Sequence, residues 1–215
     1  MRGKILAGIA ALTLLTGASN AQTVDVNASV NTTSKVLFKG RECYGASVQP
    51  DVNVNYGNIN LDFWGNVELG TGTNVWMVTP SYGFNLPHVK GNSGLNYIAF
   101  TNPTIIAHEG YISAVTDFPF SPRLKITDNF EGRIYSEVGA SETLEVLGQN
   151  VNVSGSVAGE YQSHGRDGLT HGRVNVKVPV KVGKITIMPT FSYFEPLRDD
   201  FERHFVFSAS VEGGF

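Results

Sequence analysis

The chain has 215 residues, of which 41% are hydrophobic and 16% charged, and its formal net charge is −3. No segment after the N-terminal stretch approaches the roughly 20 apolar residues of a membrane-spanning helix, which excludes a helical membrane protein. The acidic balance argues against a nucleic-acid partner, because proteins that bind nucleic acid carry a basic surface.

The first 21 residues have the design of a secretory signal peptide. Arg2 and Lys4 precede the apolar run Ile5–Leu15, and small residues lead to a cleavage position after Ala21. We therefore predict a signal peptide at 1–21 and one exported domain at 22–215. The exported part holds 14 Lys and Arg against 19 Asp and Glu, a net charge of −5.

The clearest pattern lies between Tyr44 and Leu69. Apolar residues or glycine occupy every odd position from 59 to 69, and apolar residues or proline occupy every even position from 46 to 56. A period of two predicts β-strands, and a separation of only Gly57 and Asn58 predicts a tight hairpin. Both runs are about twice the roughly 5–6 residues of an average strand and match the ~9–11 residues that cross a membrane.

About twelve such segments follow one another, and single-chain outer-membrane barrels have an even number of strands. They are Val24–Lys39, 46–56, Asn58–Leu69, Asn74–Leu86, Gly94–Thr101, His108–Phe118, Pro122–Phe130, Arg133–Val146, Val151–Tyr161, Arg173–Val182, Ile185–Phe194 and His204–Phe215. We predict an all-β fold, a transmembrane antiparallel up-and-down β-barrel, surrounded by lipid of a Gram-negative outer membrane. The pattern is weakest in Gly94–Phe118, where the periodicity slips at 104–106.

The lengths of the connecting segments predict an orientation, because outer-membrane barrels have short periplasmic turns and longer outer loops. With a periplasmic N-terminus, the inner links are Gly57-Asn58, Pro87–Ser93, Pro119–Ser121, Gly148–Asn150 and Gly183-Lys184. The outer links are Gly40–Cys43, Asn102–Ala107, Gln162–His171 and Glu195–Arg203.

The closing segment alternates from Phe205 to a terminal Phe215. A last strand that ends in an aromatic residue resembles the signature by which the barrel-assembly machinery recognises outer-membrane barrels. We therefore expect Phe215 to contact that machinery.

Several short stretches resemble the TorF-like porin family of small proteobacterial outer-membrane barrels. They are Ser34–Gly40, Gln49–Tyr56, Leu61–Asn66 and Phe205–Ser210. The resemblance is clearest over Val24–Leu69, is lost in Gly94–Glu109, and implies location and architecture. It assigns no solute and no functional residue.

Charged residues recur at the positions that face the interior of the predicted barrel. The pore-lining candidates are Lys35, Lys39, Asp51, Asp62, Trp64, Glu68, Lys125, Arg133, Arg173, Lys177 and Lys181. Acidic residues come from the second and third segments, and basic residues come mainly from the first, seventh, eighth and tenth. Opposite walls of unlike charge would create a field across the pore that orients and sorts solutes. Alternatively, the charges neutralise one another inside a filled barrel, and Glu137, Glu145 and Glu160 on the basic side favour this second interpretation.

No motif in the sequence predicts catalysis, a cofactor or a metal site. The polar side chains of His164, Asp167, His171, Asp199 and Asp200 share two predicted outer loops, but their spacing matches no metal-ligand motif. Lipid-cleaving barrels carry Ser, His and Asn on the outer face, and here no His accompanies a Ser at a strand centre on that face. The lone Cys43 excludes an intrachain disulfide, and we interpret it as a small residue in a turn rather than a reactive thiol.

These observations predict a narrow porin for passive diffusion of small polar solutes, and not an enzyme. A second hypothesis is a filled structural or surface-binding barrel that acts through the loops 162–171 and 195–203. A third is a soluble periplasmic β-sandwich.

Overall fold

The computed structural model describes residues 23–39, 41–70, 74–101, 104–146, 148–162 and 167–214, and within these ranges the regular structure is entirely β. The strands are β1 (Val24–Thr33), β2 (Val36–Phe38), β3 (Arg41–Tyr44), β4 (Ser47–Tyr56), β5 (Ile59–Glu68), β6 (Asn74–Leu86), β7 (Val89–Thr101), β8 (Thr104–Thr116), β9 (Arg123–Asp128), β10 (Arg133–Val146), β11 (Gln149–Gln162), β12 (Gly168–Lys177), β13 (Val180–Val182), β14 (Ile185–Pro196) and β15 (His204–Gly214). In the described ranges no helix is long and apolar enough to cross a membrane.

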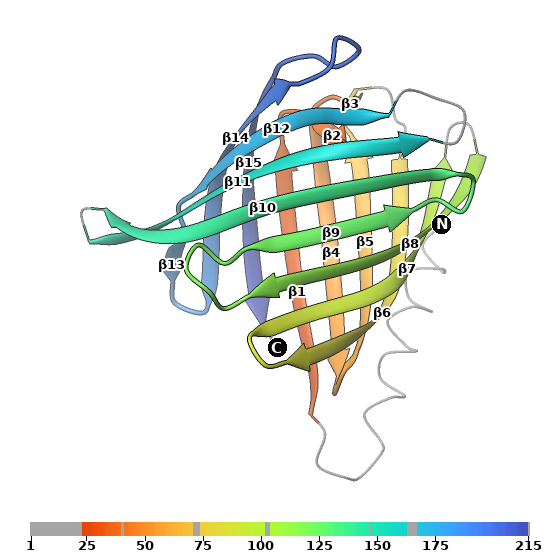
Figure 1. Cartoon of the computed structure of the whole chain (residues 1–215). Coiled ribbons are helices and arrows are strands. Elements are labelled where there is room, and N and C mark those ends of the chain that lie inside the picture. Colours follow the sequence, from red (N-terminus) through yellow and green to blue (C-terminus); the bar gives the residue numbers. More distant parts are fainter. Residues whose placement is uncertain are drawn as a thin grey trace.

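The strands form a closed antiparallel barrel (Figure 1). Each wall strand pairs with its neighbour in the chain, and β1 pairs with β15 to join the two ends of the sheet. Strands β12 and β13 both pair with β14 and act as one wall strand that is interrupted at 178–179. Counted in this way, the described residues build a wall of twelve strands. The predicted barrel of about twelve strands is confirmed.

Alternation along each strand separates an apolar outer face from a polar interior. On β7, Leu95 and Tyr97 are exposed on the outside, whereas the intervening Asn96 is buried. On β5, Ile59 is exposed and Asn66 is fully buried. An exposed apolar band with a buried polar lining is the arrangement that lipid outside and water inside require.

Prolines interrupt the wall without breaking it. Pro50 and Pro80 lie where the β4–β5 and β6–β7 ladders each skip two residue pairs. Because proline has no backbone N–H, it cannot donate to a neighbouring strand, and the ladder resumes one residue further on. At the second gap the Thr79 hydroxyl donates to Asn96 Oδ1 across 3.0 Å and bridges the two strands.

The predicted links Pro87–Ser93 and Asn102–Ala107 were wrong. A two-residue turn at 87–88, with His88 at φ 61°, joins β6 to β7, and β8 begins at Thr104. The prediction failed because Gly91 and Ser93 stand on the outer face where apolar residues were expected. The ring of Phe84 on the neighbouring strand covers Gly91, where a Cβ atom would strike it.

Two further boundaries were wrong. The first predicted strand, Val24–Lys39, ends at Thr33, and the chain then turns back as the β2–β3 hairpin. The predicted loop Gln162–His171 is shorter, because β12 begins at Gly168 and carries a β-bulge opposite Ala158 and Gly159. His171 shares the inward parity of Arg173 and lies in the barrel wall, and the bulge falls just before it, where Thr170 is buried and Leu169 is exposed. The signal peptide at 1–21, His164 and Phe215 lie outside the described residues, and the predictions about them are untested.

Candidate functional site in the barrel interior

Within the described part of the chain, four adjoining cavities lie in the barrel interior and are lined by side chains from opposite walls. The hairpin cavity (200 Å³) is lined by Leu37, Lys39, Glu109, Tyr135 and Arg173 among others. The basic cavity (560 Å³) is lined by Lys90, Arg123, Lys125, Glu137 and Arg173 with smaller residues of β7 and β8. The cross-lumen cavity (410 Å³) includes Asp51, Trp64, Arg123, Arg173, Lys177 and Glu212, and the turn-end cavity (370 Å³) includes Ser29, Asp51, Asn53, Lys184 and Glu212.

Neighbouring cavities share lining residues, so they follow one another through the barrel. Arg173 lines the hairpin, basic and cross-lumen cavities. Asp51 and Glu212 line both the cross-lumen and turn-end cavities. The row therefore extends from the β2–β3 hairpin to the end of the barrel at which β1 begins.

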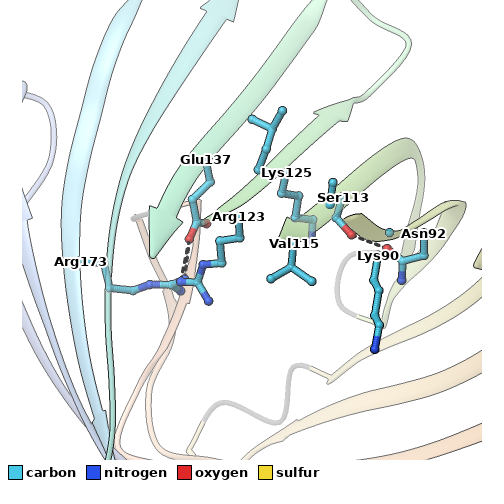
Figure 2. Close-up of a pocket in the computed structure, with 11 residues that line it drawn as sticks. Lys90, Asn92, Ser113, Val115, Arg123, Lys125, Glu137 and Arg173 are labelled. Carbon is cyan, nitrogen blue, oxygen red and sulfur yellow. Dashed lines mark hydrogen bonds and ion pairs between the residues drawn. The ribbon is translucent and has the colours of Figure 1, made fainter. Parts of the chain in front are cut away.

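The basic wall is organised around Glu137 of β10. The Arg173 Nη2 atom lies 2.6 Å from Glu137 Oε1, and the Arg123 Nη2 atom lies 3.6 Å from the same oxygen (Figure 2). Since β9, β10, β11 and β12 are consecutive in the wall, the two guanidinium groups reach one carboxylate from opposite sides. One carboxylate thus partners two arginines and leaves a local excess of positive charge.

Gly139 provides the room for this arrangement. It stands directly across from Arg123 in the β9–β10 pairing. A Cβ atom at this position would lie 2.9 Å from Arg123 Nε and 2.6 Å from the carbonyl oxygen of Gly155. Glycine lets the Arg123 side chain lie flat against β10 and extend towards Glu137.

The opposite wall is acidic. Asp51 of β4 and Asp62 of β5 lie within hydrogen-bonding reach of each other, and Glu212 of β15 lies close enough to act on Asp51 electrostatically. The Asn53 amide donates to Asp62 Oδ1 at 3.5 Å. The cross-lumen cavity lies between Asp51 and Glu212 on this wall and Arg123, Arg173 and Lys177 on the other. Acidic and basic residues thus line opposite sides of this cavity.

Trp64 faces the interior, as its position in the alternation predicted, and lines the cross-lumen cavity. It pairs across the strands with Asp51 and Met77. Its ring is thus on the acidic side of a cavity whose far side is basic. Trp76, the second tryptophan of the chain, is exposed on the outer face.

The β2–β3 hairpin folds into the barrel at the end opposite the turn-end cavity. Lys39 lies at the tip of the hairpin with φ 52°, its Nζ atom is 2.7 Å from Glu109 Oε1 of β8, and it lies 5.6 Å from the centre of the Tyr135 ring. Only 15% of the Lys39 side chain and 9% of the Glu109 side chain are exposed. His204 of β15 lies 3.4 Å from Glu42 on β3 and forms a second contact between hairpin and wall.

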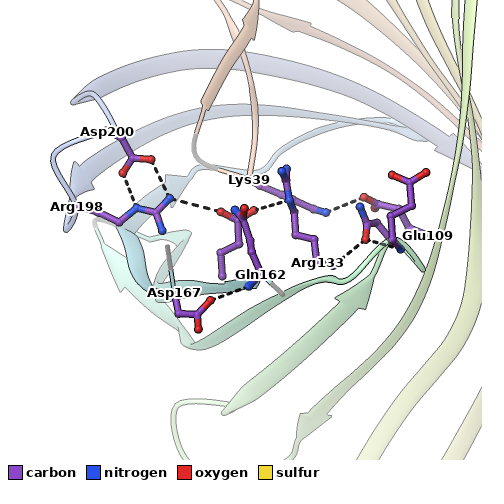
Figure 3. A network of polar contacts seen from close by, with 10 residues as sticks. Lys39, Glu109, Arg133, Gln162, Asp167, Arg198 and Asp200 are labelled. Atoms are coloured by element: carbon purple, nitrogen blue, oxygen red, sulfur yellow. Dashed lines mark hydrogen bonds and ion pairs between the residues drawn. The ribbon is translucent and has the colours of Figure 1, made fainter. Parts of the chain in front are cut away.

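The segment 197–203 between β14 and β15 narrows the same end. Arg198 lies 3.5 Å from Glu160 of β11, and Arg133 of β10 lies 3.3 Å from the same residue (Figure 3). The Asp200 carboxylate hydrogen-bonds to the Arg198 guanidinium and raises the pKa of Arg198, which keeps that group charged. Phe201 is buried against His171, with ring centres 6.2 Å apart.

The remaining predicted lumen residues lie nearer the two ends. Lys35 is paired with Glu42 inside the hairpin segment at 2.8 Å, and Arg133 is half-exposed at the rim. The Glu68 carboxylate accepts the Gly45 backbone N–H at 2.9 Å. Lys181 is exposed and stands across from Thr186, a residue that lines the turn-end cavity. These four residues do not join the group around Glu137.

Three interior residues were missed. Lys90 and Glu109 lie in the stretch where strand boundaries were misplaced, although the spacing of Lys90, Asn92 and Asn96 already carried the signal of a polar face. Glu212 lies at an inward-facing position of the closing strand and could have been found from the alternation of that strand.

A metal site finds no support in the described part of the chain, where no group of three or more His, Cys, Asp or Glu residues could hold an ion. His171, one of the loop residues considered for that role, is buried between aromatic rings of Tyr135, Phe194 and Phe201. Cys43 is exposed on β3 and is not in a disulfide. Because β3 spans Arg41–Tyr44, Cys43 lies in a strand of the hairpin, and its predicted position in a turn was wrong.

A closed twelve-stranded wall with an apolar outside and a polar interior defines a small outer-membrane β-barrel of porin-like fold. Among solved structures, the KdgM porin in complex with disordered oligogalacturonate aligns with a TM-score of 0.56 and 10% identity, over 89% of this chain and 99% of that one. An outer-membrane channel from Pseudomonas putida F1 aligns with a TM-score of 0.49 and 8% identity over 92% and 97%. The NanC porin aligns with a TM-score of 0.46 and 11% identity, over 90% of this chain and 99% of that one.

At 10% identity the likeness to the KdgM porin shows the fold alone, and the other two likenesses, with TM-scores below 0.5, carry no argument. No family model matches the sequence, and no curated protein matches it. The architecture is thus that of a small outer-membrane barrel. The resemblance to the TorF-like family is not confirmed.

Proposed function

We propose that the protein is an outer-membrane channel through which small polar solutes diffuse passively. The observation that carries this proposal is the row of four adjoining cavities from the hairpin to the turn end. A filled barrel would occupy this space with packed side chains, as small barrels do. Charged and amide side chains line the row and would replace part of the water around a passing solute.

The proposal includes an orientation, a route of export and a family. The hairpin end faces the outside of the cell, the signal peptide at 1–21 directs export, and the barrel-assembly machinery binds the strand that ends at Phe215. The stretches Ser34–Gly40 and Leu61–Asn66 support membership of the TorF-like porin family. The protein performs no catalysis and needs no cofactor.

Conductance in a planar lipid bilayer tests the channel. The full-length exported chain, folded in detergent and inserted into the bilayer, should give discrete current steps in KCl. Liposomes that contain the protein should also swell in an isotonic solution of a small neutral sugar. A correctly folded barrel that is silent in both assays would refute the channel.

A second function, that of a structural or surface-binding barrel, is favoured by the narrowing of the hairpin end. The contacts Lys39–Glu109 and Arg198–Glu160 hold two inward-folded segments over that mouth. If these contacts never open, the function lies in the surface that the segments present. The conductance measurement separates the two functions, because only the channel passes current.

A further inference from the structure

We propose that Arg123 and Arg173 form a binding site for the oxyanion group of a solute, a carboxylate or a phosphate, on the basic wall. This inference rests on the proposed channel function for the access of the solute. It goes beyond that function because it assigns a chemical class of solute and the residues that select it.

The charge around the basic cavity is strongly unbalanced. Four cationic residues, Lys90, Arg123, Lys125 and Arg173, line a space of 560 Å³ with Glu137 as the single anionic residue among its lining. Figure 2 shows these side chains directed into the same space from several strands. A cavity with this charge excess attracts an anion, and its volume lies within the range of ~300–1,000 Å³ that small-molecule sites occupy.

The two arginines also retain unused hydrogen-bond donors. The Arg123 Nη2 atom, which lies 3.6 Å from Glu137 Oε1, and the Arg173 Nε atom are buried and have no acceptor within hydrogen-bond distance in the described part of the protein. A buried donor without an acceptor is costly, and such groups in native proteins call for an explanation. An oxyanion in the basic cavity would supply acceptors to these arginines, because guanidinium groups bind carboxylate and phosphate oxygens in pairs of parallel hydrogen bonds.

The surroundings restrict the solute to a small one. Glu137 already accepts from Arg173 at 2.6 Å and competes with any incoming anion. Asp51 and Glu212 line the far side of the cross-lumen cavity that both arginines also reach, and they would repel a second negative group. The site therefore suits a solute with one anionic group held at the basic wall rather than a polyanion that fills the lumen.

Trp64 provides a reporter for the site. It lines the cross-lumen cavity together with both arginines, and Trp76 is the only other tryptophan in the sequence. In a Trp76→Phe background, the emission of Trp64 alone reports on the cavity. Inorganic phosphate is added to the folded full-length exported chain in detergent, with KCl adjusted to hold the ionic strength constant.

We expect a saturable change of Trp64 emission with phosphate, and a similar change with acetate if a carboxylate is accepted. Arg123→Gln and Arg173→Gln, singly and together, should each weaken the affinity by at least about tenfold, as for the loss of a charge-assisted hydrogen bond. Glu137→Gln should have the opposite effect and tighten binding, which general damage to the fold would not do. Arg203→Gln, at an exposed arginine paired with Glu195 at 2.8 Å, is the matched control and should leave the affinity unchanged.

The proposal is overturned if wild-type protein shows no saturable response, or if the arginine and Glu137 variants respond like the Arg203 control. If the double arginine variant does not fold, the single variants and Glu137→Gln still decide the question. The channel function is judged separately. A barrel that conducts KCl but ignores phosphate loses only the anion site, whereas one that binds phosphate but never conducts loses only the channel.

Discussion

Release of the β2–β3 hairpin should open the mouth of the barrel, and Lys39→Met is the substitution that tests this. The change keeps the apolar length of the side chain and removes the charge that contacts Glu109 at 2.7 Å. Breaking a fully buried ion pair by removing one partner costs about 3–5 kcal/mol. Because small parts of both side chains remain exposed, we expect about 2–3 kcal/mol here, or roughly a 30- to 150-fold shift of the hairpin away from its inward position.

Single-channel recording measures this shift directly. The variant should show larger or longer-lived open currents than the wild-type protein, and a wild-type barrel with few openings should become clearly conductive. Glu109→Gln removes the other partner and should act in the same direction. Lys35→Met is the control, since the Lys35–Glu42 pair lies within the hairpin segment and is partly exposed, and surface pairs contribute about 0–1 kcal/mol. If Lys39→Met and Lys35→Met give the same currents as wild type, the hairpin does not control the opening.

Three further outcomes follow from the fold. Gly94→Ala should destabilise the barrel by about 1–3 kcal/mol, because the new Cβ atom would lie 2.5 Å from a backbone carbonyl oxygen of β6. Gly83→Ala is the control and should cost much less, because the nearest atom to its new Cβ lies 3.6 Å away. Equal urea unfolding midpoints for the two variants would contradict this. Phe201→Ala should loosen the segment 197–203 and speed trypsin cleavage after Arg198 and Arg203 in proteoliposomes, with an unchanged digestion rate as the contrary result. The folded chain should migrate differently on detergent gels before and after heating, and a chain that is freely soluble without detergent would exclude the barrel in membranes.

Alternation along the chain was sufficient to predict the wall of the barrel but not its interior. Every second side chain of a wall strand faces the barrel interior, and this period of two is a local property of the sequence. The inward fold of Val36–Tyr44 depends instead on Glu109 and His204, which lie far away in the chain and become neighbours only when the barrel closes. No local pattern carries that information.

The candidate site shows the same division. Trp64, Lys125, Arg173 and Lys177 were placed inside by parity alone, and the cavities contain them. The sharing of Glu137 by Arg123 and Arg173 was not predictable, because it depends on the register of four strands, β9 to β12, and on the missing side chain of Gly139. His171 was misplaced because the predicted strand began at Arg173, whereas β12 begins at Gly168 and keeps His171 on the inward parity of Arg173.

The pairing of β1 with β15 has a consequence for how the molecule is made. Seven residue pairs, from Asn27↔Gly214 to Thr33↔Ser208, join the first wall strand to the last. Until the final strand is delivered, β1 and β14 each present an unsatisfied edge that invites pairing with another chain. A chain cut short before His204 would therefore accumulate as an open sheet prone to aggregation, so the wall closes only once β15 is in place.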